Sequence, residues 1–256
     1  MENLKLSKQK NSRDIGGMIG YQGKKVKNNR LFRGGLISKL SKEDISIIEE
    51  LHLTDIIDLR SESEFIHRPD QYFENVRYHN FSPIKEDVKL KDSASADSNL
   101  LWFLGDSTDG YAHMVKTYKE MVKEDYAIEA FRNFFKVVQI DNRSIYFHCS
   151  QGKDRTGLAA YFLEIALGVS EEDARIDYLF TNVAMQDKKK QLKDQLRNKA
   201  YFTPGYEKAL EEVFSAREEY LDSALNYIKE KYGSVEKFLT DVLDVDFDLL
   251  RSIYLI

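Results

Sequence analysis

Apolar residues follow two spacings along this chain, and these predict strands and helices in turn. Short apolar runs at residues 54–59 and 145–147 predict buried strands, and the alternation at residues 76–81 predicts a further strand. Ser41 and Asp44 have the pattern of a capping box, and the apolar residues that follow at helical spacing predict a helix there. These segments therefore predict strands that alternate with helices.

Helical spacing dominates the second half of the chain. Residues 111–139 predict one or two helices, and residues 158–167 predict a helix that Gly168 ends. Beyond a Thr-Pro-Gly break at residues 203–205, the chain is amphipathic to its end. Alternating strands and helices indicate an α/β fold with a mainly parallel sheet flanked by helices, and residues 201–256 are expected to form a C-terminal helical cap.

Residues 82–110 differ from the segments on either side because they are polar and rich in serine and aspartate. A stretch this long with so little pattern is uncommon inside a compact domain, and it indicates either partial disorder or a lid. The apolar patch at residues 100–104 favours the lid. We expect one domain over residues 1–256, with an α/β catalytic core at residues 1–200 and the cap at residues 201–256.

Composition and charge exclude several classes of protein. A hydrophobic content of 42% is enough for a sizeable core, and no run approaches the roughly 20 apolar residues of a membrane span. The net charge of −5 argues against nucleic-acid binding and against membrane-surface binding. The start of the chain has no apolar signal core, so we expect a cytoplasmic protein, or a secreted one if a leader has been removed. We also expect a monomer.

The most informative segment is residues 148–157, His-Cys-Ser-Gln-Gly-Lys-Asp-Arg-Thr-Gly, between a predicted strand and a predicted helix. A loop that runs into a helix points backbone N–H groups inward, and these groups bind a phosphate-like dianion together with the helix dipole. The loop contains Cys149, the only cysteine of the chain. The same field stabilises a thiolate, so we expect Cys149 to be nucleophilic near neutral pH.

Other residues of this loop have side chains suited to phosphoryl transfer. Arg155 presents a planar fork that can grip two phosphate oxygens. Gly152 permits a backbone conformation that a side chain would block, and the Thr156 hydroxyl can hydrogen-bond the sulfur. We expect the loop amides and Arg155 to balance the charge of the phosphoryl group without a metal or another cofactor. His148 is expected to orient the loop by hydrogen bonding, and the other histidines lack metal-ligand spacing.

A structural explanation of the cysteine has to be weighed against the catalytic one. A single cysteine after an apolar strand is more often a small buried hydrophobe than a nucleophile. In this chain, however, an arginine lies at the sixth position after Cys149, and threonine, glycine and a predicted helix follow. This combination of residues favours a catalytic role for Cys149 and Arg155.

The loop resembles the signature of the cysteine-dependent protein tyrosine phosphatase superfamily, which is His-Cys, five residues, Arg and then Ser or Thr. Its Gly-Lys-Asp-Arg-Thr-Gly portion is similar to that of the bacterial tyrosine phosphatases that also act on serine phosphates and phosphoinositides. Residues 11–17, 31–38, 58–64 and 232–234 resemble further segments of that family, in the same order. The chain departs from the family pattern in the N-terminal segments, where Ser12 replaces the usual leucine and Gly34 stands where a serine is common.

This resemblance implies a protein-tyrosine-phosphatase-like fold and a metal-independent hydrolase of phosphomonoesters that acts through a phosphocysteine intermediate. The implied substrates are phosphotyrosine in proteins, with phosphoserine, phosphothreonine and phosphoinositides as further possibilities. The implied substrate-binding residues are His148, Ser150, Gln151, Gly152 and Lys153. Phosphoinositide phosphatases carry similar lysines, so Lys153 would place a second positive charge at the rim of the site; a solvated lysine at the loop edge is the alternative.

The general acid that protonates the leaving oxygen has more than one candidate. In most of the superfamily it is an aspartate on a separate loop before the cysteine, and Asp106 and Asp109 lie in such a region. In the family that this chain resembles, the loop aspartate, here Asp154, is a proposed acid that would lie next to the leaving group. We favour Asp154, and a role limited to orienting Arg155 or Lys153 is the alternative.

Two other classes of function stay open at this point. A rhodanese-type sulfurtransferase also uses a cysteine in an anion-binding loop, although its loop does not normally carry the Arg-Thr pair at this spacing. An inactive module that only binds phosphoproteins or phospholipids is the second alternative, and the presence of Cys149, Gly152, Arg155 and Thr156 argues against it.

Overall fold

A computed structural model describes residues 2–7, 9–85, 109–198 and 203–256. In these ranges a six-stranded sheet has the order β1-β2-β3-β6-β4-β5. Its strands are β1 (Glu2–Asn3), β2 (Arg13–Asp14), β3 (Leu31–Gly34), β4 (Asp55–Asp58), β5 (Arg77–Asn80) and β6 (Ile145–His148). The last four strands in the sheet order are parallel, and β1 and β2 run antiparallel at one edge. The expected α/β fold with a mainly parallel sheet is therefore confirmed.

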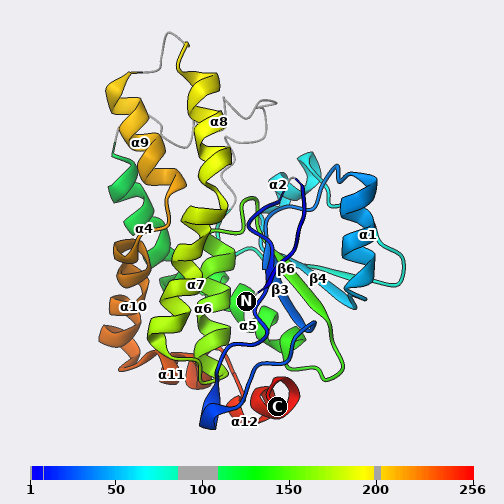
Figure 1. Ribbon diagram of the computed structural model, residues 1–256. Helices are drawn as coiled ribbons and strands as arrows, with labels where there is room; N and C mark the ends of the chain where they lie inside the picture. Colours follow the sequence, from blue (N-terminus) through cyan, green and yellow to red (C-terminus); the bar gives the residue numbers. More distant parts are fainter. Residues whose placement is uncertain (1, 8, 86–108, 199–202) are drawn as a thin grey trace.

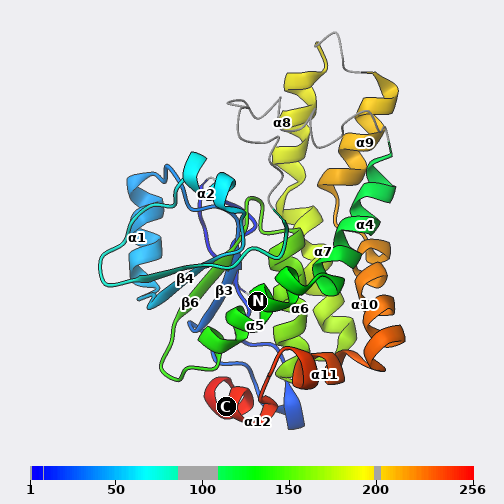
Figure 2. The same ribbon diagram turned by 180° about the vertical axis from the view of Figure 1, so that it is seen from behind.

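Helices lie on both faces of this sheet (Figures 1 and 2). One face of the sheet is covered by α1 (Lys42–Glu50), and α2 (Glu62–His67) lies near the upper edge of the sheet in Figure 1. The remaining helices are α4 (Gly110–Lys123), α5 (Asp125–Val138), α6 (Asp154–Ala166), α7 (Glu171–Ala184), α8 (Gln186–Leu196), α9 (Pro204–Phe214), α10 (Glu218–Tyr232), α11 (Val235–Lys237) and α12 (Phe247–Tyr254). Short 3₁₀ and π turns occur at Tyr21–Gly23 and Phe238–Val242. None of the helices described here is both long and apolar enough to cross a membrane.

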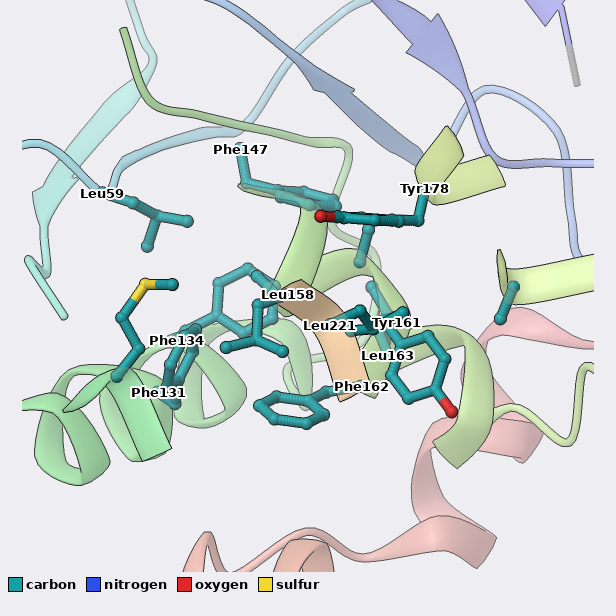
Figure 3. Packing of buried hydrophobic residues seen from close by; sticks show 14 of the residues in the cluster. Leu59, Phe131, Phe134, Phe147, Leu158, Tyr161, Phe162, Leu163, Tyr178 and Leu221 are labelled. Atoms are coloured by element: carbon teal, nitrogen blue, oxygen red, sulfur yellow. The ribbon is translucent and has the colours of Figure 1, made fainter. Parts of the chain in front are cut away.

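Two apolar clusters hold the layers together. The smaller one joins α1 to the sheet through Ile48, Phe32 and Ile56, all of them buried. The larger one lies on the opposite face, where α5 and α6 pack against β6 and where aromatic rings meet edge to face (Figure 3). Because α6 is apolar on nearly all sides and buried in this cluster, its N-terminus is held rigidly at the end of β6.

Local sequence signals account for most helix boundaries. Ser41 accepts a hydrogen bond from the backbone of Asp44 and starts α1, as expected. Thr203 caps α9 with Pro204 in its first turn, and Gly233 ends α10 with a φ of 90°. The segment expected to form one or two helices forms two, because Glu124 has extended backbone angles between α4 and α5.

The structure describes most of the predicted cap but little of the predicted lid. Helices α9 and α10 pack along α4, and α12 packs against α6, so residues 203–256 belong to the same apolar cluster as the sheet. Leu255 also forms an isolated bridge with Val26. Most of the predicted lid, residues 86–108, lies outside the described residues, and α4 begins directly after it. The division into core, lid and cap stays a prediction.

Candidate active site

The predicted phosphate-binding loop joins the end of β6 to the start of α6, between two rigid elements of the fold. Gly152 has a φ of +67° in this loop, and a Cβ atom there would lie 2.4 Å from the backbone of Gly34 at the end of β3. Both observations require glycine at this position, because other residues rarely adopt such a φ and would collide with the neighbouring strand. Close packing of the loop on β3 therefore depends on Gly152.

Three successive carbonyl groups of the loop are held by donors from other elements. Ser150 O accepts a hydrogen bond from the N–H of Leu36 at 3.4 Å, Gln151 O accepts one from Asn11 Nδ2 at 3.0 Å, and Gly152 O accepts from Asn11 Nδ2 and Arg33 Nη2, both at 3.0 Å. In a trans peptide the N–H points away from the carbonyl to which it is bonded, and no cis peptide occurs in the described chain. The N–H groups of residues 151–153 therefore point to the opposite side of the loop, as an anion cradle requires.

A buried ion-pair cluster fixes these donors in turn. Asp177 of α7 binds Arg13 Nε at 2.6 Å through one carboxylate oxygen and Arg33 Nη1 through the other. Arg13 Nη1 donates to Asn11 Oδ1 at 2.7 Å, which orients the amide so that its Nδ2 faces the loop. All four side chains are fully buried. Residues 11–17, which resemble a family segment, thus act partly by holding the loop, and Arg13 is a structural ion-pair partner.

The thiol of Cys149 lies at the start of the loop and is only 2% exposed. Burial alone would raise its pKa, but the charge of Arg155 and the hydroxyl and N–H of Thr156 lower the pKa of Cys149 below its ordinary value. The Thr156 hydroxyl is buried and has no other hydrogen-bond partner among the described residues, so it is available to the sulfur. This environment favours the thiolate that the sequence predicts.

Arg155 forms an ion pair with Glu64 of α2. Its Nη1 lies 2.5 Å from Glu64 Oε2 and its Nη2 lies 3.1 Å from Oε1, which is a bidentate pair. Ser150 Oγ donates to the same Oε1 at 2.5 Å. Burial would raise the pKa of Glu64, but Arg155 and these hydrogen bonds hold it far below its usual range. Glu64 therefore orients the plane of the guanidinium and links Ser150 to it.

His148 lies at the start of the loop, between the loop backbone and Asp70. Its Nδ1 faces Cys149 O at 3.3 Å and its Nε2 faces Asp70 Oδ2 at 3.0 Å, so each ring nitrogen lies opposite an oxygen that can accept a hydrogen bond. Burial would lower the pKa of His148, but the carboxylates of Asp70 and Asp58 raise it. These three residues have ligand-type atoms within 4.8 Å of one another. Arg60 already pairs with both carboxylates, at 2.6 and 3.3 Å, so their charge is balanced without a metal.

The side chain of Lys153 takes neither of the positions that the sequence suggested. It is buried, and Nζ donates to the carbonyl oxygens of Val213 and Ser215 at 2.6 and 3.2 Å. It also pairs with Asp154 Oδ1 at 2.8 Å. The ammonium group of Lys153 is therefore hydrogen-bonded inside the protein, at the junction of α9 and α10, and does not lie at the rim of the site.

The candidate acids have different surroundings. Asp154 is the first residue of α6, directly after the loop, and its side chain is 26% exposed. Its Oδ1 accepts a hydrogen bond from the hydroxyl of Tyr118 at 2.9 Å. Asp109 is the N-cap of α4 and accepts a hydrogen bond from the N–H of Ala112 at 2.9 Å. Asp106 lies outside the described residues.

Asn11, Arg33 and Glu64 lie in segments that resemble the family, but the sequence predicted no contact between them and the loop, and it gave no role to Tyr118 or Asp177. Glu64 gives a misleading local signal, because it also forms a capping box with Ser61 at the start of α2. Tyr118 and Asp177 occupy ordinary positions in helical patterns, so nothing in their neighbourhood marks them. Only the folded structure brings them to the loop.

Comparisons with known proteins show the family to which this chain belongs. Residues 4–255 match the model of the tyrosine phosphatase family. A protein of Cupriavidus necator that is named as a tyrosine-protein phosphatase is 31% identical over 254 residues, which cover 96% of this chain and 85% of the relative. The triple specificity protein phosphatase PtpB of Mycobacterium tuberculosis is 25% identical over 241 residues, which cover 84% of this chain and 86% of that protein. This chain belongs to the tyrosine phosphatase family, and it is an enzyme of the protein-tyrosine phosphatase class.

Proposed function

We propose that this phosphatase works in two steps through a phosphocysteine at Cys149. In the first step Sγ attacks phosphorus, the S–P bond forms and the ester P–O bond breaks while the leaving oxygen takes a proton. In the second step water attacks phosphorus, the S–P bond breaks and the thiolate is restored. The observation that carries this proposal is that the carbonyl groups of Gln151 and Gly152 are bound by Asn11 and Arg33, which turns the N–H groups that follow them the other way, beside a buried thiol of lowered pKa.

The charge of the transferred phosphoryl group needs donors that are in place beforehand. The loop amides supply one set, and their positions are fixed by the backbone. Arg155 supplies the other, and its ion pair with Glu64 limits the movement of the guanidinium. The Thr156 hydroxyl stabilises the sulfur as the leaving group of the second step.

Asp154 is the general acid in this proposal. It lies next to the loop, its side chain is partly exposed, and Oδ2 accepts no hydrogen bond from any described residue. Asp109, by contrast, uses its carboxylate as a helix cap. In the second step the resulting carboxylate can accept the proton of the attacking water, so the same group serves both steps.

The proposed substrate is phosphotyrosine in proteins. The relative from Mycobacterium tuberculosis is named for a triple specificity, and we extend a broad range to this chain, with phosphoserine, phosphothreonine and phosphoinositides hydrolysed more slowly. The buried ammonium of Lys153 gives no support to recognition of a headgroup with several phosphates. Comparison of kcat/KM across phosphotyrosine and phosphoserine peptides and short-chain phosphoinositides tests this order; a preference for the lipids would reverse it.

The nucleophile is tested with Cys149→Ser. The hydroxyl is a poor nucleophile near neutral pH, but the cradle does not depend on sulfur, so turnover of an aryl phosphate should vanish while inorganic phosphate still binds. Phosphate binding is measured by calorimetry and turnover by product release. Substantial residual hydrolysis would exclude the covalent mechanism. The same preparation should show no cyanide-dependent consumption of thiosulfate in its wild-type form, which separates the chain from the sulfurtransferases.

The acid is tested with Asp154→Asn and, as the matched control, Asp109→Asn. Loss of the acid should remove the basic limb of the pH–rate profile and slow alkyl phosphates far more than aryl phosphates with good leaving groups. Asp109→Asn should leave both properties unchanged. If the control shows the pattern and Asp154→Asn does not, the assignment of the acid is wrong.

A further inference from the structure

The hydroxyl of Tyr118 lies next to the carboxylate of Asp154 and to the hydroxyl of Tyr178. Tyr118 comes from the middle of α4, and its side chain is fully buried. Its hydroxyl donates to Asp154 Oδ1 at 2.9 Å and lies 2.8 Å from the hydroxyl of Tyr178 of α7. Tyr178 in turn donates to the carbonyl oxygen of Arg217 at 3.3 Å. A buried hydroxyl that is aimed at a carboxylate in this way restricts the rotation of the carboxylate.

Lys153 acts on the same carboxylate oxygen. An ammonium group has three N–H donors, and those of Lys153 face the carbonyl oxygens of Val213 and Ser215 and the Oδ1 of Asp154. All three donors are thus used inside the protein. Lys153 cannot turn toward a substrate without leaving two buried carbonyl groups unpaired, which is unfavourable.

The two oxygens of Asp154 are consequently different. Oδ1 has two donors, Lys153 Nζ and Tyr118 Oη, at 2.8 and 2.9 Å. Oδ2 has no donor among the described residues, and the side chain is 26% exposed. A carboxyl group whose Oδ1 is occupied in this way carries its proton on Oδ2, the oxygen left open toward solvent.

We propose that Tyr118 is a positioning residue of the phosphatase reaction, which fixes the rotamer of Asp154 and keeps the transferable proton on Oδ2. This inference rests on the proposed role of Asp154 as the general acid. Lys153 has a part in the same arrangement, as the charged partner of Oδ1. Tyr118 touches neither the substrate nor the phosphoryl group, and its effect on the reaction passes through Asp154.

Several charged or titratable groups face Asp154. Helix α6 and the loop contribute the cations of Lys153 and Arg155 and the thiol of Cys149. The helices packed around them contribute the groups that interact electrostatically with Asp154, namely His113, Tyr118, Tyr178 and Tyr220. Burial raises the pKa of Tyr118 well above its ordinary value, so its hydroxyl keeps its proton and stays a donor across the working pH range.

The test is Tyr118→Phe, which keeps the ring and removes the hydroxyl. Because the carboxylate loses a donor that favours its charged form, the basic limb of the kcat profile should move to higher pH, by about half to one pH unit. Because the rotamer is less restricted, kcat at the pH optimum should fall about threefold to tenfold for alkyl phosphates and much less for aryl phosphates. The limb position and the leaving-group dependence are both read from steady-state rates.

Tyr178→Phe is the matched control. It removes the hydroxyl that lies next to that of Tyr118 without removing a contact to Asp154, so it should leave the basic limb in place. If both variants move the limb equally, or if neither does, the positioning role is wrong. Thermal unfolding of both variants shows whether the loss of a buried hydroxyl destabilises the fold, which would lower the amount of active enzyme without moving a pH limb.

A double-mutant cycle separates this inference from the proposed function beneath it. In an Asp154→Asn background, Tyr118→Phe should add no further loss with alkyl phosphates, because both changes act on the same proton transfer. Additive losses would show that Tyr118 acts elsewhere and would overturn the inference. If Asp154→Asn alone fails to change the leaving-group dependence, the assignment of the acid has failed instead.

Discussion

Glu64 contacts Arg155 and Ser150 directly and affects Cys149 through Arg155. Its carboxylate holds both terminal nitrogens of Arg155, accepts the hydroxyl of Ser150 and caps α2 through Ser61. Arg155 in turn lowers the pKa of Cys149. One carboxylate therefore determines both the geometry of the phosphate fork and the strength of the positive field at the sulfur.

Glu64→Gln separates these two effects. Without its carboxylate partner, the guanidinium of Arg155 is less well placed, and kcat/KM should fall on the order of tenfold to a hundredfold. The field of Arg155 at the sulfur is then no longer offset by a negative charge, so the pKa of Cys149 should fall further and the acidic limb of kcat/KM should move to lower pH. The measurement is the pH profile of kcat/KM for an aryl phosphate.

Glu62→Gln is the control at this scale, because Glu62 is an exposed residue in the first turn of the same helix. It should change neither the rate nor the profile. An unchanged acidic limb in Glu64→Gln would mean that Glu64 has no electrostatic effect on the thiol.

At the scale of elements, the catalytic loop depends on segments far from it in sequence. Asn11 lies just before β2, Arg33 in β3 and Asp177 in α7, and together they hold the carbonyl groups of Gln151 and Gly152. The loop itself has few side-chain contacts that could do this. The orientation of the N–H groups of the loop therefore depends on β3, on the segment before β2 and on α7.

Asn11→Ala should loosen the loop without removing a group that touches the substrate. The carbonyl of Gln151 loses its side-chain donor, so the N–H groups are less well preorganised, and both kcat/KM and the affinity for vanadate should fall by about tenfold. Vanadate inhibition constants and steady-state rates give the two values. Asn226→Ala, at an exposed position of α10, is the control and should change neither. Unaltered vanadate affinity in Asn11→Ala would argue against the clamp.

Prediction from sequence succeeded where the signal is local. The helix after Ser41, the strands near residues 54–59 and 145–147, and the loop itself are each specified by neighbouring residues, and each is present. No strand was predicted at Arg13–Asp14, which has only two residues, or at Leu31–Gly34, where an arginine and a glycine interrupt the apolar pattern. The contacts of the site were missed for a different reason: Asp177 and Tyr118 reach the loop from distant helices, and no spacing along the chain encodes that.

Lys153 shows the limit of a local motif. Its place in the loop suggested a charge at the rim, yet the side chain follows the start of α6 and turns inward to the end of α9. Carbonyl groups at the junction of α9 and α10 attract it, and they lie about 60 residues away in the chain. A motif thus fixes the backbone position of a residue more firmly than the direction of a long side chain.

At the scale of the whole molecule, a buried acid pair couples stability to pH. Asp177 is flanked by Arg13 and Arg33, and burial, which would raise its pKa, is outweighed by their charges, so its pKa falls to about 2. Burial and the nearby charge of Asp177 raise the pKa of Glu164 well above its ordinary value of 4.5. Glu164 therefore keeps its proton to higher pH in the folded protein than in the unfolded chain.

The sign of the resulting pH dependence follows from proton counts. Above about pH 4.5 the folded state retains a proton that the unfolded state has released, so stability falls as pH rises, by up to about 1.4 kcal/mol per pH unit, until Glu164 ionises in the folded state too. Glu164→Gln imitates the protonated acid and should remove this slope and raise stability at pH 7. Urea unfolding between pH 5 and 8 measures both.

The raised pKa of His148 also couples stability to pH, so the test compares the wild type with Glu164→Gln. Asp177→Asn should lower the stability, whereas Glu164→Gln raises it at pH 7. The reason is that Asp177→Asn leaves two buried guanidinium groups without their carboxylate. Parallel stability curves for the wild type and Glu164→Gln would show that Glu164 is ionised in the folded protein.

Direct detection of the phosphoenzyme tests the central claim, that Cys149 carries the phosphoryl group. The enzyme is mixed with an aryl phosphate, quenched in acid within the first turnover and digested, and the peptide that contains residue 149 is analysed by mass spectrometry. The account predicts phosphate on Cys149 in the wild type and none on any residue in Cys149→Ser. Phosphate on another residue, or a burst of product with no phosphorylated Cys149, would contradict it.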